Sequence, residues 1–310
     1  MKILVMGTGG IGGYFGGLLA KSGEEVYFVA RGEHLKALKN QGLSVKSVAG
    51  DFWLRVNATD RPEEAGPVDL VLFCVKTYDT ETAAKQILPN LHSQTVVLTL
   101  QNGVDHGEKI GKIVGPDKVM AGAVYIESSV HAPGVISQTA GLRKVIFGEL
   151  QGPVTARARD LLSTFQKAGI LCELSEDMRK TLWSKFIMIS AVSGLTGLTR
   201  TPMREAVEFP ETREIFLAAL KESMEVAKAL SIPLDPDLVD RILAGVSNFN
   251  KESKASLLRD LEKEKRVEVE ALSGTVVRLG KELSVPTPVH QVIYACLKLA
   301  DERNRARAHP

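Results

Sequence analysis

Short apolar runs alternate with amphipathic stretches through the first half of the chain. The apolar runs are rich in β-branched residues and stay apolar over most of their length, as strands covered on both faces do. The predicted strands are residues 2–6, 26–29, 68–75, 95–100 and 119–125, and the predicted helices between them are residues 10–22, 34–41, 80–91 and 108–114. This alternation predicts a parallel sheet with helices on both faces.

Two further segments of the first half fit the edges of such a sheet. Residues 134–138 and 144–148 have the pattern of a β-hairpin that closes one edge, with residues 139–143 as its turn. Residues 42–57 favour short extra strands.

The pattern changes after about residue 175, where strand signals nearly disappear. Long helical stretches follow, separated by segments rich in Gly, Thr, Ser and Pro. These stretches are residues 177–195, 212–230, 236–244, 251–283 and 288–300. We therefore expect an α/β protein: a Rossmann-type dinucleotide-binding domain over residues 1–176, then an all-α helical domain over residues 177–310 that binds substrate. The apolar stripes of these helices also suit a homodimer.

The composition is that of an ordinary globular protein with nearly balanced charge. The 310 residues are 44% hydrophobic, and 39 Lys and Arg against 37 Asp and Glu leave a net charge of +2. A nucleic-acid or anionic-membrane binder needs a concentrated basic surface, so we expect neither partner. No run reaches the roughly 18 uninterrupted apolar residues of a membrane helix.

The cysteines and the first residues bear on metals and location. Cys74, Cys172 and Cys296 are far apart and form no Cys-x-x-Cys pair, so neither a disulfide framework nor a zinc site is expected. Cys74 lies in an apolar run, which favours a buried small side chain over a nucleophile. The apolar stretch after Met1 ends at a cluster of glycines and is too short for a signal peptide. We expect a cytoplasmic protein.

A glycine-rich motif stands between the first predicted strand and the first predicted helix. It matches the dinucleotide-binding pattern G-x-G-x-x-G in the required context and comprises Gly7, Thr8, Gly9, Gly10, Ile11 and Gly12. In this pattern the first glycine permits a tight turn, the second lets the backbone approach a pyrophosphate, and the third lets helix and strand pack closely. The N–H groups of the helix N-terminus favour phosphate. A purely structural glycine turn is the alternative.

The residue at the end of the second predicted strand distinguishes the two nicotinamide cofactors. NAD calls for an acidic residue there, which accepts from the ribose 2′-hydroxyl. This chain has Arg31, a bidentate cation suited to a phosphate. The sequence therefore predicts NADPH/NADP⁺, with a solvated loop arginine as the alternative.

Two other predicted strands end in polar residues. Lys76 follows residues 68–75, and Asn102 follows residues 95–100. Ligands bind at the carboxyl edge of open α/β sheets, so both residues are candidates for contacting cofactor or substrate. For Asn102, which precedes Gly103, an ordinary Asn-Gly turn is the alternative.

The candidate for chemistry in the second half is a lysine at the start of an apolar helix. Lys185, Ile189 and Ser193 lie on one helix face at i, i+4 and i+8. A lysine entering a buried helix needs a carboxylate partner, a ligand, or room to extend to solvent. Spacing alone favours the last of these and leaves Asp260 and Glu268 both open as partners.

Taken together, the order and spacing of these motifs resemble the ketopantoate reductase (2-dehydropantoate 2-reductase) family over nearly the whole chain. The matching segments are the glycine motif with Arg31, Lys76-Thr77, Gln101-Asn102-Gly103, Pro133-Gly134-Val135, Gly148-Glu149, Trp183-x-Lys185, and Ser256-x-x-x-Asp260 through Glu268. The resemblance implies the same two domains, no metal, and NADPH-dependent reduction of a small 2-oxo acid, ketopantoate, to pantoate in pantothenate biosynthesis. It also implies that Lys76 and Arg31 contact the cofactor, Arg31 at its 2′-phosphate.

The resemblance further implies roles for four residues. Lys185 matches the catalytic lysine that donates the proton, and Glu268 matches the glutamate that partners it. Asn102 matches an asparagine that contacts both nicotinamide and substrate. Ser256 matches a serine that hydrogen-bonds substrate.

Two positions depart from the family pattern. Characterised members have asparagines four and eight residues after the catalytic lysine, where this chain has Ile189 and Ser193. Ile189 forms no hydrogen bond, and Ser193 is a shorter substrate ligand than asparagine. The reaction type is unaffected, but the exact substrate is left open.

Ser256 and Glu268 cannot share a face of one straight helix. At 3.6 residues per turn they would lie about 120° apart. If both face the substrate, the predicted helix 251–283 must break, and the alternation around Val267 places the break near residues 263–267.

Two other functions stay open. The first is a paralogous NADPH-dependent reductase of another 2-oxo acid or an imine, which Ile189 and Ser193 motivate. The second is a regulator that senses NADP(H) without turnover. The presence of both Lys185 and Glu268 argues against a sensor, because a sensor needs no proton donor.

Overall fold

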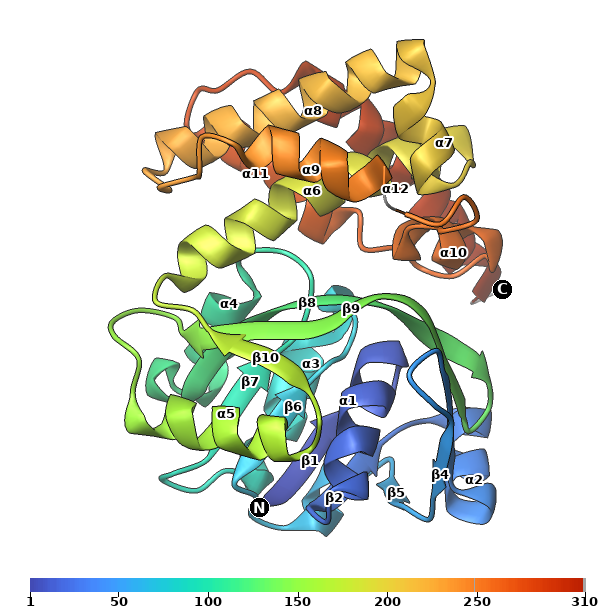
Figure 1. Ribbon diagram of the computed structural model, residues 1–310, viewed down its shortest axis with the longest axis vertical. Coiled ribbons are helices and arrows are strands. Elements are labelled where there is room, and N and C mark those ends of the chain that lie inside the picture. Colours follow the sequence, from blue (N-terminus) through green and yellow to red (C-terminus); the bar gives the residue numbers. More distant parts are fainter. Residues whose placement is uncertain (248, 309–310) are drawn as a thin grey trace. The chain divides into compact units, whose positions relative to one another are not determined.

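The computed structural model describes residues 1–247 and 249–308, and the chain forms two compact units (Figure 1). The first unit consists of residues 1–101 and 105–181. The second begins with residues 102–104 and continues from residue 182. The short segment 102–104 therefore packs with the helical residues, although it lies between two elements of the first unit.

A mixed sheet forms the centre of the first unit. Its order is β4-β3-β9-β8-β7-β6-β1-β2-β5, and β10 pairs with β9. The strands from β8 through β7, β6, β1 and β2 to β5 run parallel, which confirms the Rossmann-like arrangement. The strands are β1 (Lys2–Met6), β2 (Glu25–Val29), β3 (Leu43–Ser47), β4 (Phe52–Leu54), β5 (Asn57–Thr59), β6 (Leu70–Phe73), β7 (Val96–Thr99), β8 (Val119–Ala132), β9 (Val135–Glu149) and β10 (Leu171–Leu174).

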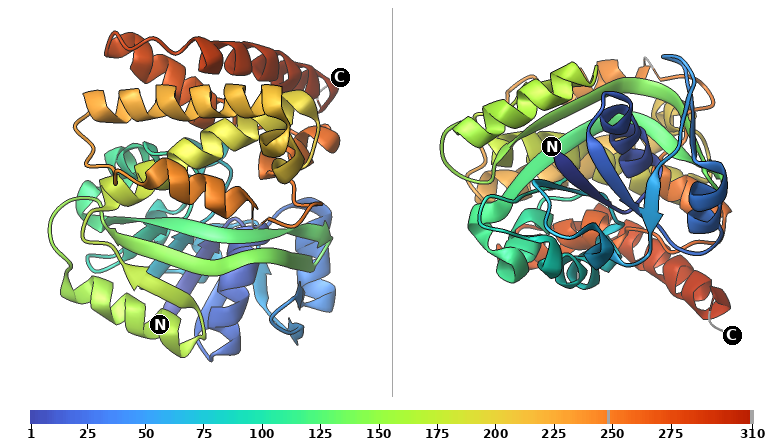
Figure 2. Two further views of the ribbon diagram at one scale, coloured as in Figure 1. Left: turned by 45° about the horizontal axis from the view of Figure 1, so that its top comes forward. Right: turned by 90° about the horizontal axis from the view of Figure 1, so that it is seen from below.

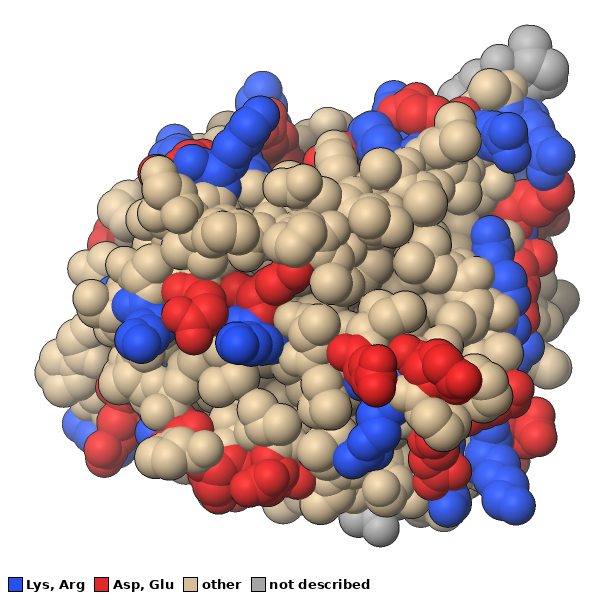
Figure 3. Space-filling model, turned by 90° about the horizontal axis from the view of Figure 1, so that it is seen from above, with Lys and Arg blue, Asp and Glu red and all other residues tan. Residues whose placement is uncertain are grey.

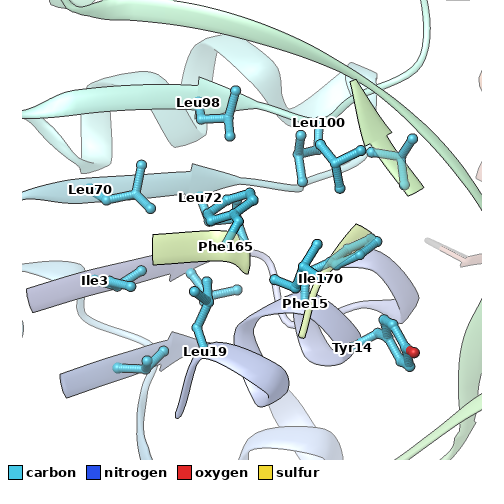
Figure 4. Packing of buried hydrophobic residues seen from close by; sticks show 14 of the residues in the cluster. Ile3, Tyr14, Phe15, Leu19, Leu70, Leu72, Leu98, Leu100, Phe165 and Ile170 are labelled. Carbon is cyan, nitrogen blue, oxygen red and sulfur yellow. The ribbon is translucent and has the colours of Figure 1, made fainter. Parts of the chain in front are cut away.

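Helices cover both faces of this sheet, as the alternating pattern predicts. Ile3 and Val5 of β1 pack on one face with α1 and α5, where Phe15, Leu19 and Phe165 are fully enclosed or nearly so (Figure 4). Leu4 and Met6 pack on the other face with α3 and α4. The helices are α1 (Gly10–Lys21), α2 (Gly32–Gln41), α3 (Thr80–Gln86), α4 (His106–Val114) and α5 (Ala156–Lys167).

Short 3₁₀ turns connect several of these elements. They are η1 (Pro62–Ala65), η2 (Thr77–Asp79), η3 (Leu88–Asn90) and η4 (Pro116–Lys118). The predicted helix 80–91 is too long, because α3 ends at Gln86. Pro89 lacks the amide hydrogen that an α-helix would need there, and it lies in the 3₁₀ turn η3 instead.

The predicted hairpin is wrong, because its two strands are parts of one longer strand. Residues 135–149 form one strand, β9, whose antiparallel partner is β8, and Pro133 and Gly134 make the turn between them (Figure 2). Gly141 and Arg143 have φ of +86° and +55° inside β9, and the β8–β9 register shifts around Tyr125. These residues carry a turn signal because the strand is irregular there.

The sequence patterns gave no sign of α5 or β10. Phe165 and Leu161 of α5 are buried, and the remaining positions of the helix are mostly polar. β10 extends the sheet by pairing in parallel with β9. The short strands predicted within residues 42–57 are confirmed as β3, β4 and the start of β5.

The second unit is helical and has its own core around Phe186, Phe216 and Leu220. A short helix, α7, was not predicted. The helices are α6 (Met178–Thr199), α7 (Met203–Glu208), α8 (Pro210–Ala229), α9 (Leu238–Ser247), α10 (Ser256–Glu262), the π-helical turn η5 (Glu270–Gly274), α11 (Thr275–Glu282) and α12 (Pro288–Ala308).

Helix α6 continues through Gly194 and Gly197 to Thr199, beyond the predicted end at residue 195. A Cβ on Gly194 would lie 2.6 Å from Ile293 Cγ2, and one on Gly197 would lie 2.9 Å from Leu257 Cδ2. The glycines therefore let neighbouring helices approach α6 rather than terminate it. Helix α6 is long and apolar enough to cross a membrane, but 67% of its most apolar 18-residue stretch is buried within the structure, as in a core helix.

The expected break between Ser256 and Glu268 is confirmed. Helix α10 ends at Glu262, Glu264 has a φ of +51°, and residues 265–268 lie outside helix and strand before η5 begins. Five consecutive residues in a π-helical turn are rare outside functional regions.

The face drawn in Figure 3 carries Lys and Arg side chains next to Asp and Glu side chains, with broad uncharged areas between them. No extended field of one sign covers this face.

Candidate active site

The glycine motif forms the tight loop between β1 and α1. Gly7 has a φ of +102°, and a Cβ there would lie 2.9 Å from the amide nitrogen of Val75. A Cβ on Gly12 would lie 2.2 Å from the Gly7 carbonyl oxygen and 2.8 Å from Val5 Cγ1. Both positions thus require glycine for the reasons that the motif predicts, a left-handed turn and close packing of helix on strand.

Gly9 differs from these glycines because its surroundings are open. A Cβ built on it meets no atom within 4 Å. The N-terminus of α1 behind it has no side-chain cap and no acidic residue in its first turn. Open space beside uncapped helical N–H groups fits a pyrophosphate, so the loop passes this test for a dinucleotide.

The other members of the motif hold the loop in place. The amide and the hydroxyl of Thr8 both donate to the Val29 carbonyl, the latter at 2.9 Å, so the donors of Thr8 are directed to β2. Gly10 packs against the backbone of Ser128, whose hydroxyl donates to the Gly10 carbonyl at 3.0 Å. Ile11 is half-buried against the core of the unit.

Arg31 follows β2 and immediately precedes α2. Its side chain is exposed, and within the described residues its guanidinium forms no hydrogen bond or ion pair. An arginine with its five donors unused at the end of the second strand is suited to bind a phosphate.

Lys76 and Gln101 lie where β6 and β7 end. Lys76 is half-buried and directly precedes η2. Gln101 is buried, and its Nε2 donates to the Val75 carbonyl at 3.0 Å and to Thr80 Oγ1 at 2.9 Å. Gln101 thereby ties the carboxyl ends of the two strands together. Its position just before Asn102 is the only sequence signal for this role.

Lys185 and Asn102 come together in the second unit. Lys185 Nζ donates a hydrogen bond of 3.0 Å to Asn102 Oδ1. The predicted candidates therefore contact each other directly, and the alternative for Lys185, extension into solvent, is wrong. Because Asn102 Oδ1 is the acceptor, its Nδ2 amide hydrogens are left to donate to another group.

Burial and one carboxylate set the acidity of Lys185. Burial lowers the pKa of the Lys185 ammonium from 10.5 to about 8, and the negative charge of Glu268 opposes this change. Of the two carboxylates that spacing left open, Glu268 is therefore the one that acts on Lys185. Glu268 itself is only 6% exposed.

The predicted substrate residues lie on two helices of the second unit. Ser193 is buried on α6, two turns after Lys185, and its hydroxyl makes no hydrogen bond within the described residues. Ile189 is half-buried between them and packs against the core. Ser256 is half-buried as the first residue of α10.

Two other predictions concern cysteine and metal chemistry. Burial raises the pKa of the Cys74 thiol far above its usual range, which fits an inert packed side chain. Within the part of the chain that the structure describes, no three His, Cys, Asp or Glu side chains gather as a metal site.

Both halves of the chain match family models. Residues 3–152 match "Ketopantoate reductase PanE/ApbA", and residues 177–301 match "Ketopantoate reductase PanE/ApbA C terminal". The two matches follow the order of the two units.

Full-length relatives agree with these matches. The oxidoreductase YkpB of Bacillus subtilis (strain 168), which carries the label uncharacterized, is 30% identical over 304 residues that cover 96% of this chain and 98% of its own. The 2-dehydropantoate 2-reductase of Mesorhizobium japonicum is 31% identical over 328 residues, covering 98% and 99%.

A solved structure has the same fold. The PanE/ApbA family ketopantoate reductase from Ralstonia eutropha JMP134 superimposes with a TM-score of 0.91 at 31% identity, over 98% of this chain and 100% of its own. With both halves matched in order and relatives aligned over nearly their whole length, this chain belongs to the ketopantoate reductase (PanE/ApbA) family of oxidoreductases.

Proposed function

We propose that this chain reduces 2-dehydropantoate (ketopantoate) to pantoate with NADPH, in the cytoplasmic synthesis of pantothenate. The observation that carries this proposal is the state of Lys185. Its ammonium donates a hydrogen bond to Asn102 and has a pKa of about 8, because burial lowers the pKa and the negative charge of Glu268 partly offsets that change. We choose ketopantoate as the substrate because relatives at about 30% identity are named 2-dehydropantoate 2-reductase.

The reaction needs a proton donor for the oxygen of a 2-oxo acid. A bound nicotinamide dinucleotide supplies the hydride. Negative charge then builds on the ketone oxygen, and Lys185 stabilises it and donates its proton. With a pKa of about 8, Lys185 is charged at neutral pH and is a stronger acid than an ordinary lysine. Glu268 keeps the ammonium charged before turnover.

Three polar side chains of the second unit support substrate binding, those of Asn102, Ser193 and Ser256. Asn102 Nδ2 can donate to substrate because Oδ1 is used by Lys185. Among residues 1–247 and 249–308 no protein group hydrogen-bonds the Ser193 hydroxyl, and Ser256 begins α10 with its side chain half-buried. These residues match polar groups that a hydroxylated carboxylic acid presents.

The residues for the cofactor lie in the first unit. The α1 N–H groups beside Gly9 would hold the pyrophosphate, and Arg31 would hold the 2′-phosphate that distinguishes NADPH. Lys76, at the end of β6, would contribute a second positive charge.

Ile189 favours a second candidate function. On the face that carries Lys185 and Ser193, an isoleucine replaces a hydrogen-bonding residue of the family pattern with apolar surface. A 2-oxo acid whose side chain is more apolar than that of ketopantoate would gain from burial against it. The enzyme would then be a paralogous reductase with the same proton donor.

A steady-state assay distinguishes these functions. The purified protein is mixed with NADPH or NADH and with ketopantoate or a panel of aliphatic and aromatic 2-oxo acids, and cofactor oxidation is followed by absorbance. We expect the highest kcat/KM for ketopantoate with NADPH. A higher value for another 2-oxo acid would establish the paralogous reductase. Binding of NADPH without oxidation by any 2-oxo acid would establish a sensor.

A further inference from the structure

Helix α12 holds the irregular backbone segment that leads into Glu268. The Val267 amide donates a hydrogen bond of 2.7 Å to Asp301 Oδ1, and Asp301 is only 3% exposed. One turn further along α12, Asn304 Nδ2 donates to the Lys265 carbonyl at 2.7 Å. Residues 265–268 lie outside helix and strand. The Lys265 amide donates to the Asp260 carbonyl and the Glu268 carbonyl accepts from the Leu272 amide, whereas the Val267 amide and the Lys265 carbonyl find their partners on α12.

The same helix also holds the backbone that follows Glu268. Ser273 lies in the π-helical turn η5, and its Oγ is 3.2 Å from His290 Nδ1 on α12. His290 Nε2 lies 3.0 Å from the Ala219 carbonyl and 2.9 Å from Ser223 Oγ, both on α8. A carbonyl only accepts, so Nε2 carries the proton and Nδ1 accepts from the Ser273 hydroxyl.

Of the contacts from α12, the one made by Asp301 reaches the backbone nearest to Glu268. The Val267 amide that it binds lies in the peptide group between Arg266 and Val267, one residue before Glu268, and Val267 and Glu268 are both buried. A buried amide that loses its acceptor must rotate or find another partner, and either change turns the following residue. Exposed Glu302 lies beside Asp301 but pairs instead with Lys298 and Arg305.

We propose that Asp301 is a positioning residue for Glu268: by accepting the Val267 amide hydrogen bond, it fixes the backbone from which the Glu268 carboxylate acts on Lys185. Asn304 and the His290–Ser273 contact support the same segment from either side. The kinetic consequence rests on the proposed function, whereas the effect on Lys185 itself does not.

The test measures the acidity of Lys185 in the full-length protein without substrate. Acetylation of Lys185 by acetic anhydride is followed by mass spectrometry between pH 6 and 10, because only the neutral amine reacts. The variants are Asp301→Ala, Asp301→Asn, Glu268→Gln and the double variant Asp301→Ala/Glu268→Gln. Glu302→Ala is the matched control on the same helix, and thermal melting reports whether each variant folds.

We expect Glu268→Gln and Asp301→Ala each to move the pKa of Lys185 below the wild-type value of about 8. Asp301→Asn, which keeps an acceptor oxygen, should restore the wild-type value, and Glu302→Ala should not alter it. In the Glu268→Gln background, Asp301→Ala should produce no further change. An equal further change in that background, or a wild-type value in Asp301→Ala, would overturn the proposal.

Two readouts keep this result separate from the proposed function. If Asp301→Ala does not fold, Asn304→Ala removes the neighbouring support and is held to the same expectation. On the reductase assay, Asp301→Ala should lower kcat about tenfold with little change in the KM for NADPH. A protein that reduces no 2-oxo acid but shows the Lys185 changes would refute the proposed function and retain the role of Asp301.

Discussion

Lys185 Nζ and Asn102 Oδ1 are joined by a hydrogen bond of 3.0 Å, although 83 residues separate them in the sequence. Asn102 lies three residues after the end of β7 at Thr99, yet it belongs to the helical unit. The amide dipole satisfies one proton of the ammonium without adding a negative charge, so burial still lowers the pKa of Lys185 to about 8. A neutral partner thus leaves Lys185 able to release its proton.

Replacing this lysine should remove the proton donor and leave cofactor binding unchanged. Lys185→Met keeps much of the apolar stem and loses the ammonium. We expect kcat to fall by about 1000-fold, within the usual range for a general acid, with an unchanged dissociation constant for NADPH. Lys221→Met, at an exposed position of α8, is the matched control. Wild-type kcat in Lys185→Met on the preferred 2-oxo acid would show that another group supplies the proton.

The pH dependence should report the same residue. Lys185 acts in its protonated form, so reductase activity should be constant below about pH 8 and decline as pH rises above it. An ordinary lysine would place this decline above pH 10, near 10.5. The measurement is kcat/KM for the 2-oxo acid between pH 6 and 10.5. The residual activity of Lys185→Met should lack the decline, and an identical decline in that variant would assign it to a different group.

The glycine motif offers a contrast between two single-methyl changes. Gly9→Ala adds a Cβ to open space, so the melting temperature should change little while NADPH affinity falls about tenfold or more. Gly12→Ala places a Cβ 2.2 Å from the Gly7 carbonyl oxygen, so it should lower both stability, by about 1–3 kcal/mol, and affinity. Thermal melting and NADPH fluorescence titration separate the two. Full NADPH affinity in Gly9→Ala would show that the pyrophosphate does not approach this glycine.

Sequence patterns predicted the parts of this protein that depend on local order. The strand–helix alternation and the loop before α1 follow from short-range spacing and from chain stereochemistry. The break before Glu268 follows from helix geometry together with the roles that the family resemblance implies for Ser256 and Glu268. Long-range packing decided the rest. Gly194 and Gly197 look like a helix end, but Ile293 and Leu257 pack against them, and no local signal contains that information.

The choice of carboxylate for Lys185 had the same limit. Asp260 and Glu268 are both compatible with the spacing. The family resemblance selects Glu268, and the fold places its negative charge where it acts on the ammonium. Asp301 had no sequence signal at all, because its task is to accept a backbone hydrogen bond from a segment 34 residues away.

Arg31 should determine the preference between the two nicotinamide cofactors. Its guanidinium has no partner within the described residues, so its removal leaves no protein group unpaired. Arg31→Ala should raise the KM for NADPH by about 10- to 100-fold, the value of a charge-assisted hydrogen bond, and leave that for NADH nearly unchanged. The measurement is kcat/KM with each cofactor, and Arg55→Ala, an exposed arginine that donates to the Asn40 carbonyl, is the control. Equal losses with both cofactors would mean that Arg31 does not read the 2′-phosphate.

Acid stability should depend on His290. Burial lowers the pKa of this imidazole from 6.5 to about 4, so between these values the unfolded chain binds a proton that the native protein does not. The free energy of unfolding should therefore fall as pH drops from 6.5 to 4, and His290 should contribute about 3 kcal/mol of that loss. His290→Asn lowers stability at pH 7 because Ser273 and the Ala219 carbonyl lose a partner, but its stability should fall less steeply with acid. Urea unfolding at pH 7, 6, 5 and 4 measures both slopes, with exposed His131→Asn as the control. Parallel slopes for wild type and His290→Asn would mean that other groups, and not the contact that supports η5, set the acid limit of the fold.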